Sequence, residues 1–494
     1  MLEILLTPLF ASLTVWLLGR RLGRQVGWIV VVALLFATFR AVMVALDVAE
    51  EGPISQDYFI VAPGIVLGFL ADGLSAPTLA VVLLLCTALA TYSIRYLAHR
   101  IEVLYADESV DVQTGYYVRF FALLPLFPLG FIGTILSTNL VTVYFFMEVL
   151  TLTLFFLMAY YGYRERVRVA FISLAWGIMG ALLFLVAALL IYSELGSLAI
   201  DDLPTLAGSP VATAIVTLFT VSLMLKLAIM PFHVWMPSVH AEHPTCIAGL
   251  LAVYANLAVY VLIRVAVLPM GVDFAPLGTP LMVLALVTMV YGSLLTLAQT
   301  DIKRLAACST ISQIAYSVLG LGALTASSVE GGLFFFLSHI MGKTVFFSTA
   351  GIVVYTTGIR DMRALGGLAR KMPLTATLWV LGCLMLSGFP PFSSFTAEWI
   401  MFTGIFERGA LTGAFGLTIA IVGLTAILLT VAYTFGAART IFFGPLTPEL
   451  QTMELQDPPW TMTVPLFVVA AVSIWLGIFP RPMMNLLDSV VGHL

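Results

Sequence analysis

Residues 226–237 read Lys-Leu-Ala-Ile-Met-Pro-Phe-His-Val-Trp-Met-Pro, and this stretch decides how the chain folds. It lies in an apolar run at roughly 212–238, which is long enough to cross the ~30 Å hydrocarbon core of a bilayer. Pro231 and Pro237 interrupt a helix here, because proline lacks a backbone donor and clashes with the preceding turn. Broken backbone at membrane depth persists only where protein or water surrounds it. The stretch therefore predicts a broken membrane-spanning helix inside a helical bundle.

The whole chain has the composition of a membrane protein. Its 494 residues are 61% hydrophobic and 10% charged, with a mean hydropathy of +1.08, whereas a soluble domain is about 45–50% apolar and about 25% charged. The net charge of −4 provides no basic face for nucleic acid. The four cysteines stand alone in apolar runs, so the sequence indicates no disulfide framework, zinc site or iron–sulfur ligation. The Met1-Leu2-Glu3 start lacks the basic residues of a cleaved signal peptide, so we expect the first apolar run to be retained.

Fourteen apolar runs reach spanning length, which predicts an all-α integral membrane protein of about 14 transmembrane helices. Alternate loops are rich in arginine, as at 20–24 and 164–168. Because basic residues concentrate in cytoplasmic loops, both termini are predicted on the non-cytoplasmic side. The runs lie at roughly 2–18, 26–47, 74–98, 117–137, 139–161, 167–193, 212–238, 245–268, 277–299, 303–323, 330–357, 372–404, 411–443 and 461–485.

The twelfth run is also broken, by Gly388-Phe-Pro-Pro-Phe-Ser-Ser. The two breaks lie five spans apart, an odd number, so corresponding helices would run in opposite directions. This pattern predicts two inverted five-helix repeats, spans 4–8 and 9–13, with broken helices 7 and 12 near the functional site. Simple proline kinks are the alternative, but an ionisable residue lies beside each break. The predicted domains are an N-terminal three-helix segment (1–116), a first repeat (117–268), a second repeat (277–443) and a C-terminal helix (461–494).

Four ionisable side chains lie inside the apolar runs: Glu148, Lys226, Lys343 and Glu398. An ionised side chain at mid-bilayer costs at least about 2.5–3.5 kcal/mol on insertion scales, so such residues face the protein interior. Arginine stays charged, whereas removal from water favours the neutral forms of lysine and glutamate. These four residues are therefore the predicted proton-translocating groups. A static Glu148–Lys226 ion pair is the alternative, and it leaves the other two without partners.

Histidines supply candidate relay groups, because an unperturbed histidine titrates near pH 6.5. His233, His240 and His243 cluster around the end of the seventh span, and His339 lies four residues before Lys343, on the same helix face. A metal site at the three clustered histidines is the alternative, although prolines break the helical frame between them and no thiol joins them. We expect His233 to bond the carbonyls that the break frees.

Two charged groups lie at the ends of spans. Arg264 closes the eighth span and is expected to extend to the non-cytoplasmic interface. Asp301-Ile-Lys303-Arg304 opens the tenth span. It is either an ordinary charged helix start or part of a route for proton uptake.

Taken together, four motifs resemble the antiporter-type subunits of respiratory complex I, the Mrp antiporters and the membrane-bound hydrogenases. The resemblance runs from about residue 70 to 405, and Asp72-Gly-Leu-Ser is also similar. The motifs are Lys226-x4-Pro-Phe-His-x-Trp-Met-Pro-x2-His240-x3-Pro244, Asp301-Ile-Lys-Arg-Leu-x-Ala-x-Ser-Thr-Ile-Ser-Gln, His339-x3-Lys343 and Gly388-Phe-Pro-Pro-x4-Thr-Ala-Glu398.

The resemblance implies a hydrated polar axis through the membrane centre, with Glu148 and Lys226 as the family's pair. Glutamate at position 398 suggests the middle antiporter-like type, chain M of complex I or its Mrp counterpart. Two positions depart from the family's pattern. Asn256 stands where an eighth-span lysine is usual, and it can bond water but carries no proton; Ala228 replaces a proline. Asn256 is therefore predicted as a relay position that depends on water.

The function that the resemblance implies is that of a proton-translocating subunit of a redox-driven complex I-type oxidoreductase that uses NADH, ferredoxin or a deazaflavin with quinone. The alternatives are an Mrp-type Na⁺/H⁺ antiporter subunit, the membrane module of a hydrogenase or of an inorganic-carbon uptake complex, and a purely structural spacer. The chain would belong to an enzyme as a translocase subunit without redox chemistry of its own. Quinone, flavin and iron–sulfur clusters are expected in partner subunits, no cofactor or metal in this chain. The expected partners are antiporter-like neighbours and small helical subunits in a prokaryotic plasma membrane, with H⁺ or Na⁺ as cargo and no nucleic acid.

Overall fold

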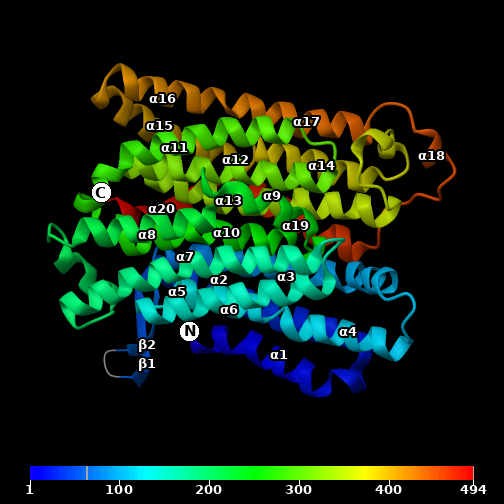
Figure 1. Ribbon diagram of the computed structural model, residues 1–494, viewed down its shortest axis with the longest axis horizontal. Helices are drawn as coiled ribbons and strands as arrows, with labels where there is room; N and C mark the ends of the chain where they lie inside the picture. The colour runs from blue at the N-terminus through cyan, green and yellow to red at the C-terminus, as the bar shows by residue number, and fades with distance from the viewer. Residues whose placement is uncertain (63–64, 493–494) are drawn as a thin grey trace.

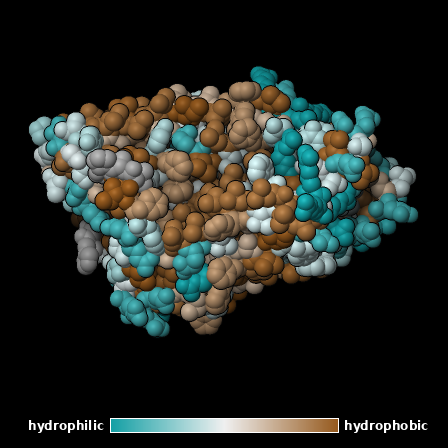
Figure 2. Space-filling model, turned by 90° about the horizontal axis from the view of Figure 1, so that it is seen from below, coloured by the Kyte–Doolittle hydropathy of each residue, from teal (hydrophilic) through white to brown (hydrophobic). Residues whose placement is uncertain are grey.

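The computed structural model describes residues 1–62 and 65–492 and forms a bundle of long helices that run side by side (Figure 1). The space-filling view shows a broad apolar belt between two polar ends (Figure 2). Twelve helical segments are long and apolar enough to cross a membrane, and the first of them, Leu2–Glu51, contains two helices joined by a short turn. The prediction of a helical integral membrane protein is confirmed. The count of fourteen spans and the inverted repeats stay predictions.

The helices follow the chain in the order in which they pack. Their bounds are α1 Leu2–Leu22, α2 Val26–Glu51, α3 Ser75–Leu104, α4 Val110–Leu123, α5 Leu126–Leu136, α6 Leu140–Tyr161, α7 Arg166–Leu195, α8 Ala212–Leu227, α9 Met236–Glu242, α10 Ala248–Leu262, α11 Gly271–Leu297, α12 Ile302–Ala323, α13 Ala326–Thr357, α14 Pro373–Leu386, α15 Ser393–Thr412, α16 Ala414–Thr425, α17 Ile427–Phe442, α18 Pro448–Gln451, α19 Trp460–Ile478 and α20 Arg481–Val491.

One hairpin departs from the all-helical expectation. Strands β1 (Ile54–Ala62) and β2 (Ile65–Ala71) pair antiparallel, with Ile54 opposite Ala71. The amino group of Met1 donates a 3.3 Å hydrogen bond to Gln56 in β1. Helix α20 lies against Gly73, just after β2, where a Cβ would meet the Leu486 carbonyl. Both ends of the chain therefore lie at the hairpin end of the bundle, as Figure 1 also shows.

Three central segments form the core of the bundle. In Thr245–Val267, Ile302–Ala323 and Ala326–Thr357 the most apolar part is entirely buried, whereas in Leu2–Glu51 and Ala414–Phe442 only 33% of it is. Helices α10, α12 and α13 therefore contact protein on every side, and α1, α2, α16 and α17 form the outer surface. Polar groups on the central helices are shielded from lipid.

Candidate functional site

The first break follows Lys226, which lies in the last turn of α8 and is 4% exposed. The helix ends because Ala228 adopts a left-handed conformation, with φ 53°, ahead of Pro231. The backbone groups that the break frees are hydrogen-bonded: Trp235 Nε1 donates to the Leu225 carbonyl at 3.1 Å, and the amide of Met230 donates to a threonine hydroxyl on α11 at 3.1 Å. The break thus fixes Lys226 inside the bundle.

Lys226 contacts a tyrosine rather than a carboxylate. Its Nζ donates to the Tyr254 hydroxyl at 3.3 Å and lies 5.2 Å from the centre of that ring. The same hydroxyl lies 3.1 Å from Thr151 Oγ1 on α6. Glu148 is one turn earlier on the face of α6 that carries Thr151. It is half-buried, its Oε1 has no hydrogen-bond partner, and it lies within electrostatic range of Lys226. The predicted Glu148–Lys226 pair is therefore adjacent but not closed in this conformation.

The eighth-span position that departs from the family's pattern contacts a predicted relay residue. Asn256 on α10 shares a 3.0 Å hydrogen bond between its Oδ1 and Nδ1 of His339 on α13, and its amide nitrogen donates to the Ala252 carbonyl at 2.7 Å. Both side chains are buried. Tyr254 and Asn256 are two residues apart on α10, and side chains at that spacing do not face each other. The Lys226 cluster and the His339 cluster therefore lie on different faces of α10.

Lys343 is held by the neighbouring central helix. Its Nζ donates to Ser309 Oγ on α12 at 2.5 Å and lies 3.4 Å from the Ala306 carbonyl. The side chain is fully buried. Ser309 belongs to the serine-rich part of the tenth-span motif, whose polar residues face the bundle interior. This contact gives that motif a direct role in holding the ammonium group.

The second break positions Glu398. Helix α14 ends at Leu386, Gly388 adopts φ 62°, and α15 begins at Ser393. Glu398 on α15 is 6% exposed, and a Cβ added at Gly388 would overlap its carboxylate. Only a glycine leaves room for the carboxylate to lie against this break.

Polar groups continue from α12 toward this glutamate. Gln313 Nε2 donates to Thr430 Oγ1 at 2.9 Å and to the Tyr433 hydroxyl at 3.2 Å, both on α17. Tyr316 and Tyr433 lie within electrostatic range of Glu398. The space between Lys343 and Glu398 is therefore lined with hydroxyl and amide groups.

Lys303 is a third buried lysine, although its place in the sequence also fits an ordinary charged helix start. It is fully buried, its Nζ donates to the His243 carbonyl at 2.7 Å and lies 3.7 Å from the centre of the Tyr163 ring. His240 and His243 are buried beside it, and no ring nitrogen of either has a hydrogen-bond partner in the described part of the chain. Three of the four lysines are therefore interior, and only Lys371 lies in an exposed loop. The scarcity of lysine in the loops is the sequence signal that points to this residue.

His233 does not join these clusters. It is half-buried, its Nδ1 has no hydrogen-bond partner, and its ring packs edge-on against Tyr291 with centroids 4.9 Å apart. The expectation that it bonds the freed carbonyls is wrong, because Trp235 makes that contact. The larger side chain reaches back over the break to α8.

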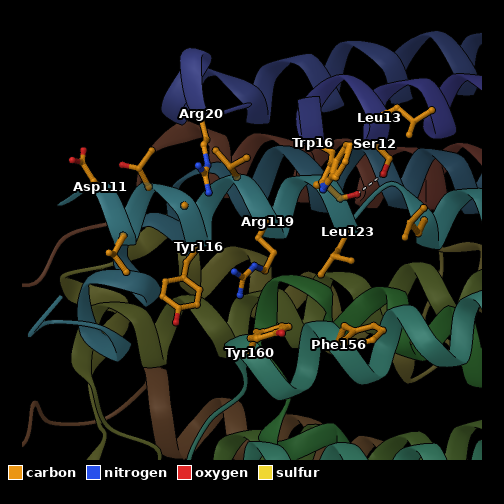
Figure 3. Close-up of a pocket in the computed structure, with 16 residues that line it drawn as sticks. Ser12, Leu13, Trp16, Arg20, Asp111, Tyr116, Arg119, Leu123, Phe156 and Tyr160 are labelled. Atoms are coloured by element: carbon orange, nitrogen blue, oxygen red, sulfur yellow. Dashed lines mark hydrogen bonds between the residues drawn. The ribbon is translucent and has the colours of Figure 1, made fainter. Parts of the chain in front are cut away.

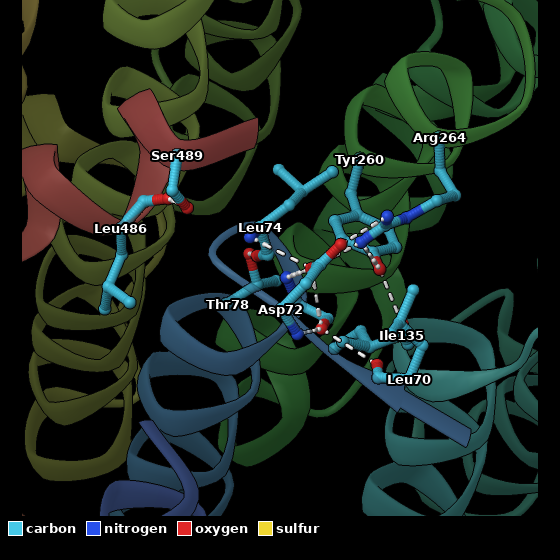
Figure 4. Close-up of polar contacts among 10 residues, drawn as sticks. Leu70, Asp72, Leu74, Thr78, Ile135, Tyr260, Arg264, Leu486 and Ser489 are labelled. Atoms are coloured by element: carbon cyan, nitrogen blue, oxygen red, sulfur yellow. Dashed lines mark hydrogen bonds and ion pairs between the residues drawn. The ribbon is translucent and has the colours of Figure 1, made fainter. Parts of the chain in front are cut away.

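Arg264 forms a buried ion pair instead of extending to the interface, so that expectation is also wrong (Figure 4). Its guanidinium donates to both carboxylate oxygens of Asp72 at 2.6 and 2.7 Å and to the Tyr260 hydroxyl at 3.3 Å. Burial opposes ionisation of Asp72, but Arg264 and hydrogen bonds from Ser75 outweigh it, so the pKa of this carboxyl lies below its usual value. A bidentate pair needs no water around the guanidinium, so Arg264 stays in the protein.

The alternative of a histidine metal site finds no support. Within residues 1–62 and 65–492, no group of three or more histidine, cysteine, aspartate or glutamate side chains is arranged to hold a metal ion.

Residues 137–428 match the protein family described as "NADH:quinone oxidoreductase/Mrp antiporter, TM". The chain belongs to this family. Among curated relatives, NADH-quinone oxidoreductase subunit N of Heliobacterium modesticaldum is 30% identical over 391 residues, 77% of this chain and 79% of the relative. NADH-quinone oxidoreductase subunit M of Rhodobacter capsulatus is 28% identical over 381 residues, 74% of this chain and 72% of the relative.

Solved structures of family members share the fold. A chain of the Mrp complex from Dietzia sp. superposes with a TM-score of 0.86 at 20% identity, covering 100% of this chain and 98% of that chain. A chain of respiratory complex I from Thermus thermophilus superposes with a TM-score of 0.84 at 22% identity, covering 99% of each. Relatives named subunit M, subunit N and Mrp antiporter subunit all match, so the middle antiporter-like type stays a prediction.

Proposed function

We propose that this chain translocates protons as a membrane subunit of a redox-driven complex I-type assembly. The observation that carries the proposal is the series of buried titratable groups along the centre of the bundle. Ionisable side chains inside a membrane protein are rare and usually serve transport. This series comprises Glu148, Lys226, His339, Lys343 and Glu398.

In the proposed cycle, closing the Glu148–Lys226 pair stabilises the charged ammonium. Opening it leaves the ammonium without a counter-charge in a site shielded from water, which favours release of its proton. The conformation described here, with Lys226 on Tyr254, corresponds to the open state. The released proton would pass around α10 through water to His339 and on to Lys343 and Glu398.

Proton uptake is proposed to use Lys303. Its ammonium lies against Tyr163, whose ring also contacts Arg100 and Arg360 at 3.9 and 5.4 Å from its centre. A pocket of about 360 Å³ lined by Tyr163 and these two arginines adjoins it. Since the basic loops are predicted to be cytoplasmic, this pocket would supply protons from that side, and both termini would lie on the opposite side.

The geometry favours H⁺ over Na⁺ as the cargo of the central series. Sodium needs oxygen ligands, whereas lysine offers donors and a positive charge. An Mrp-type exchange of Na⁺ for H⁺ is the second candidate, since Mrp subunits are among the relatives. Membrane modules of hydrogenases and inorganic-carbon uptake complexes are further alternatives. Redox groups would lie in partner subunits, so this chain's share in an enzyme would be translocation.

The test uses the purified assembly reconstituted in vesicles, with a pH-sensitive dye reporting proton uptake during turnover. Lys226→Ala and Glu148→Gln are each expected to lower proton movement at least tenfold relative to electron transfer. Lys371→Ala is the matched control, because it removes an exposed lysine from the same chain. Undiminished proton movement in both interior variants would overturn the proposed route. Turnover-driven uptake of ²²Na⁺ in place of H⁺ would favour the Mrp alternative.

A further inference from the structure

A groove of about 980 Å³ runs along the outer surface between α1 and α6, with α4 beneath it (Figure 3). It lies at the arginine-rich end of the bundle, opposite the hairpin. Asp111, Arg20 and Arg119 line one end, and Leu13 and Trp16 line the other. No residue of the proposed proton route lines it, so it calls for a different explanation.

The charged end holds two cations without a counter-ion. None of the ion pairs in the described part of the chain includes Arg20 or Arg119. The guanidinium of Arg119 lies over the rings of Tyr116 and Tyr160, 5.2 and 4.9 Å from their centres, which orients it in the groove. Arginine stays charged in proteins, and its planar group binds phosphate well. This end is therefore suited to a phosphate group.

The other end is apolar and open. Trp16 is 71% exposed, Leu13 is 44% exposed and Phe156 on α6 is 41% exposed. Arg20 and Leu13 are seven residues apart on α1, about 10 Å along the helix at 1.5 Å per residue. The groove thus joins the level of a lipid headgroup to the hydrocarbon region.

We propose that this groove binds one glycerophospholipid, with its phosphate between Arg20 and Arg119 and an acyl chain along Leu13, Trp16 and Phe156. Asp111 stands at the same end and favours a headgroup that also carries an ammonium. The chemistry therefore selects phosphatidylethanolamine over phosphatidylglycerol, whose headgroup has no cation for the carboxylate. A helix of a neighbouring subunit would fill the apolar end but would leave both arginines unpaired, which is costly near lipid.

The test is photolabelling of the intact assembly in phosphatidylcholine vesicles that contain a phosphatidylethanolamine with a diazirine in its acyl chain. Labelled peptides from α1 and α6 are expected. Arg20→Gln with Arg119→Gln should raise the half-saturating lipid fraction about thirtyfold, which corresponds to about 1 kcal/mol for each arginine near a membrane surface. Arg21→Gln is the matched control, because Arg21 is the next residue on α1, is exposed and does not line the groove.

A second variant keeps the charges and blocks the space. Gly115 lines the groove, and a Cβ built on it meets nothing within 4 Å, so Gly115→Trp should fill the headgroup end without disturbing the fold. Labelling should then fall to background. Asp111→Asn should remove the preference for phosphatidylethanolamine over phosphatidylglycerol in competition. Equal labelling of the double-arginine variant and Arg21→Gln, or crosslinks from the groove to another subunit, would overturn the proposal.

Discussion

Replacing Asn256 by leucine tests whether protons pass through the contact between α10 and α13. Leucine is close to asparagine in size, so the buried helix packing is kept. The change removes Oδ1, which shares the 3.0 Å hydrogen bond with Nδ1 of His339. His339 Nε2 already lacks a partner in the described structure, so neither ring nitrogen would then be bonded.

The magnitude follows from the burial of both groups. Asn256 and His339 are 0% and 1% exposed, so water does not replace the lost bond without entering the core. Leaving a buried polar group unpaired costs about 1–3 kcal/mol. If the ring must hold its orientation for transfer, each 1.36 kcal/mol slows the step tenfold. Proton translocation should therefore fall by about 5- to 150-fold.

The assay compares the initial rate of vesicle acidification with electron transfer measured in the presence of an uncoupler. The uncoupled rate should be unchanged, because it reports only that the assembly is intact. Asn485→Leu is the matched control, since Asn485 is exposed on α20. Asn256→Lys, which restores the family's usual residue, should retain or raise the transport rate. A wild-type acidification rate in Asn256→Leu would refute the role of this contact.

Three further predictions concern the other buried polar groups. Asp72→Asn should cost about 3–5 kcal/mol of stability, because it leaves the Arg264 charge buried without its partner; a lower thermal unfolding temperature of the assembly checks this. The pKa of Asp72 is below its usual value near 3.9, so its contribution is fully present above that pH and is lost as pH falls through the lowered pKa; acid unfolding curves of Asp72→Asn should lack this dependence. Lys303→Met should slow proton uptake at least tenfold while electron transfer with an uncoupler stays unchanged, and an unaltered acidification rate would exclude Lys303 from the route. Ser309→Ala should lower proton translocation about 5- to 20-fold by removing the 2.5 Å contact to Lys343, with Ser309→Thr, which keeps a hydroxyl, as the conservative rescue.

Much of the candidate site is predictable from the sequence alone. A lysine or glutamate in a long apolar run is conspicuous, and Glu398, Lys226 and Lys343, which stand out in this way, lie buried in the bundle. The i, i+4 spacing of His339 and Lys343 also places both on one central helix. Such signals are strong because each depends on residues within one segment.

Contacts between segments are much harder to predict. Tyr254 and Ser309 look like ordinary core residues in the sequence, yet they hold the two interior lysines. Lys303 resembles a charge at a helix start, because nothing local shows that the loop after α9 covers it. Helices buried on every side carry no amphipathic stripe, so their patterns do not tell which faces meet.

The sequence by itself determined that this chain spans a membrane as a bundle of helices, that two of them are broken, and where the ionisable groups lie along it. Hydropathy, proline chemistry and residue identity are local properties, so they need no knowledge of neighbours. Only the tertiary structure decided which groups meet: Arg264 with Asp72, 192 residues away, Asn256 with His339, and an open rather than closed arrangement of Glu148 and Lys226. Pairing depends on how distant helices pack, and packing is a property of the whole bundle.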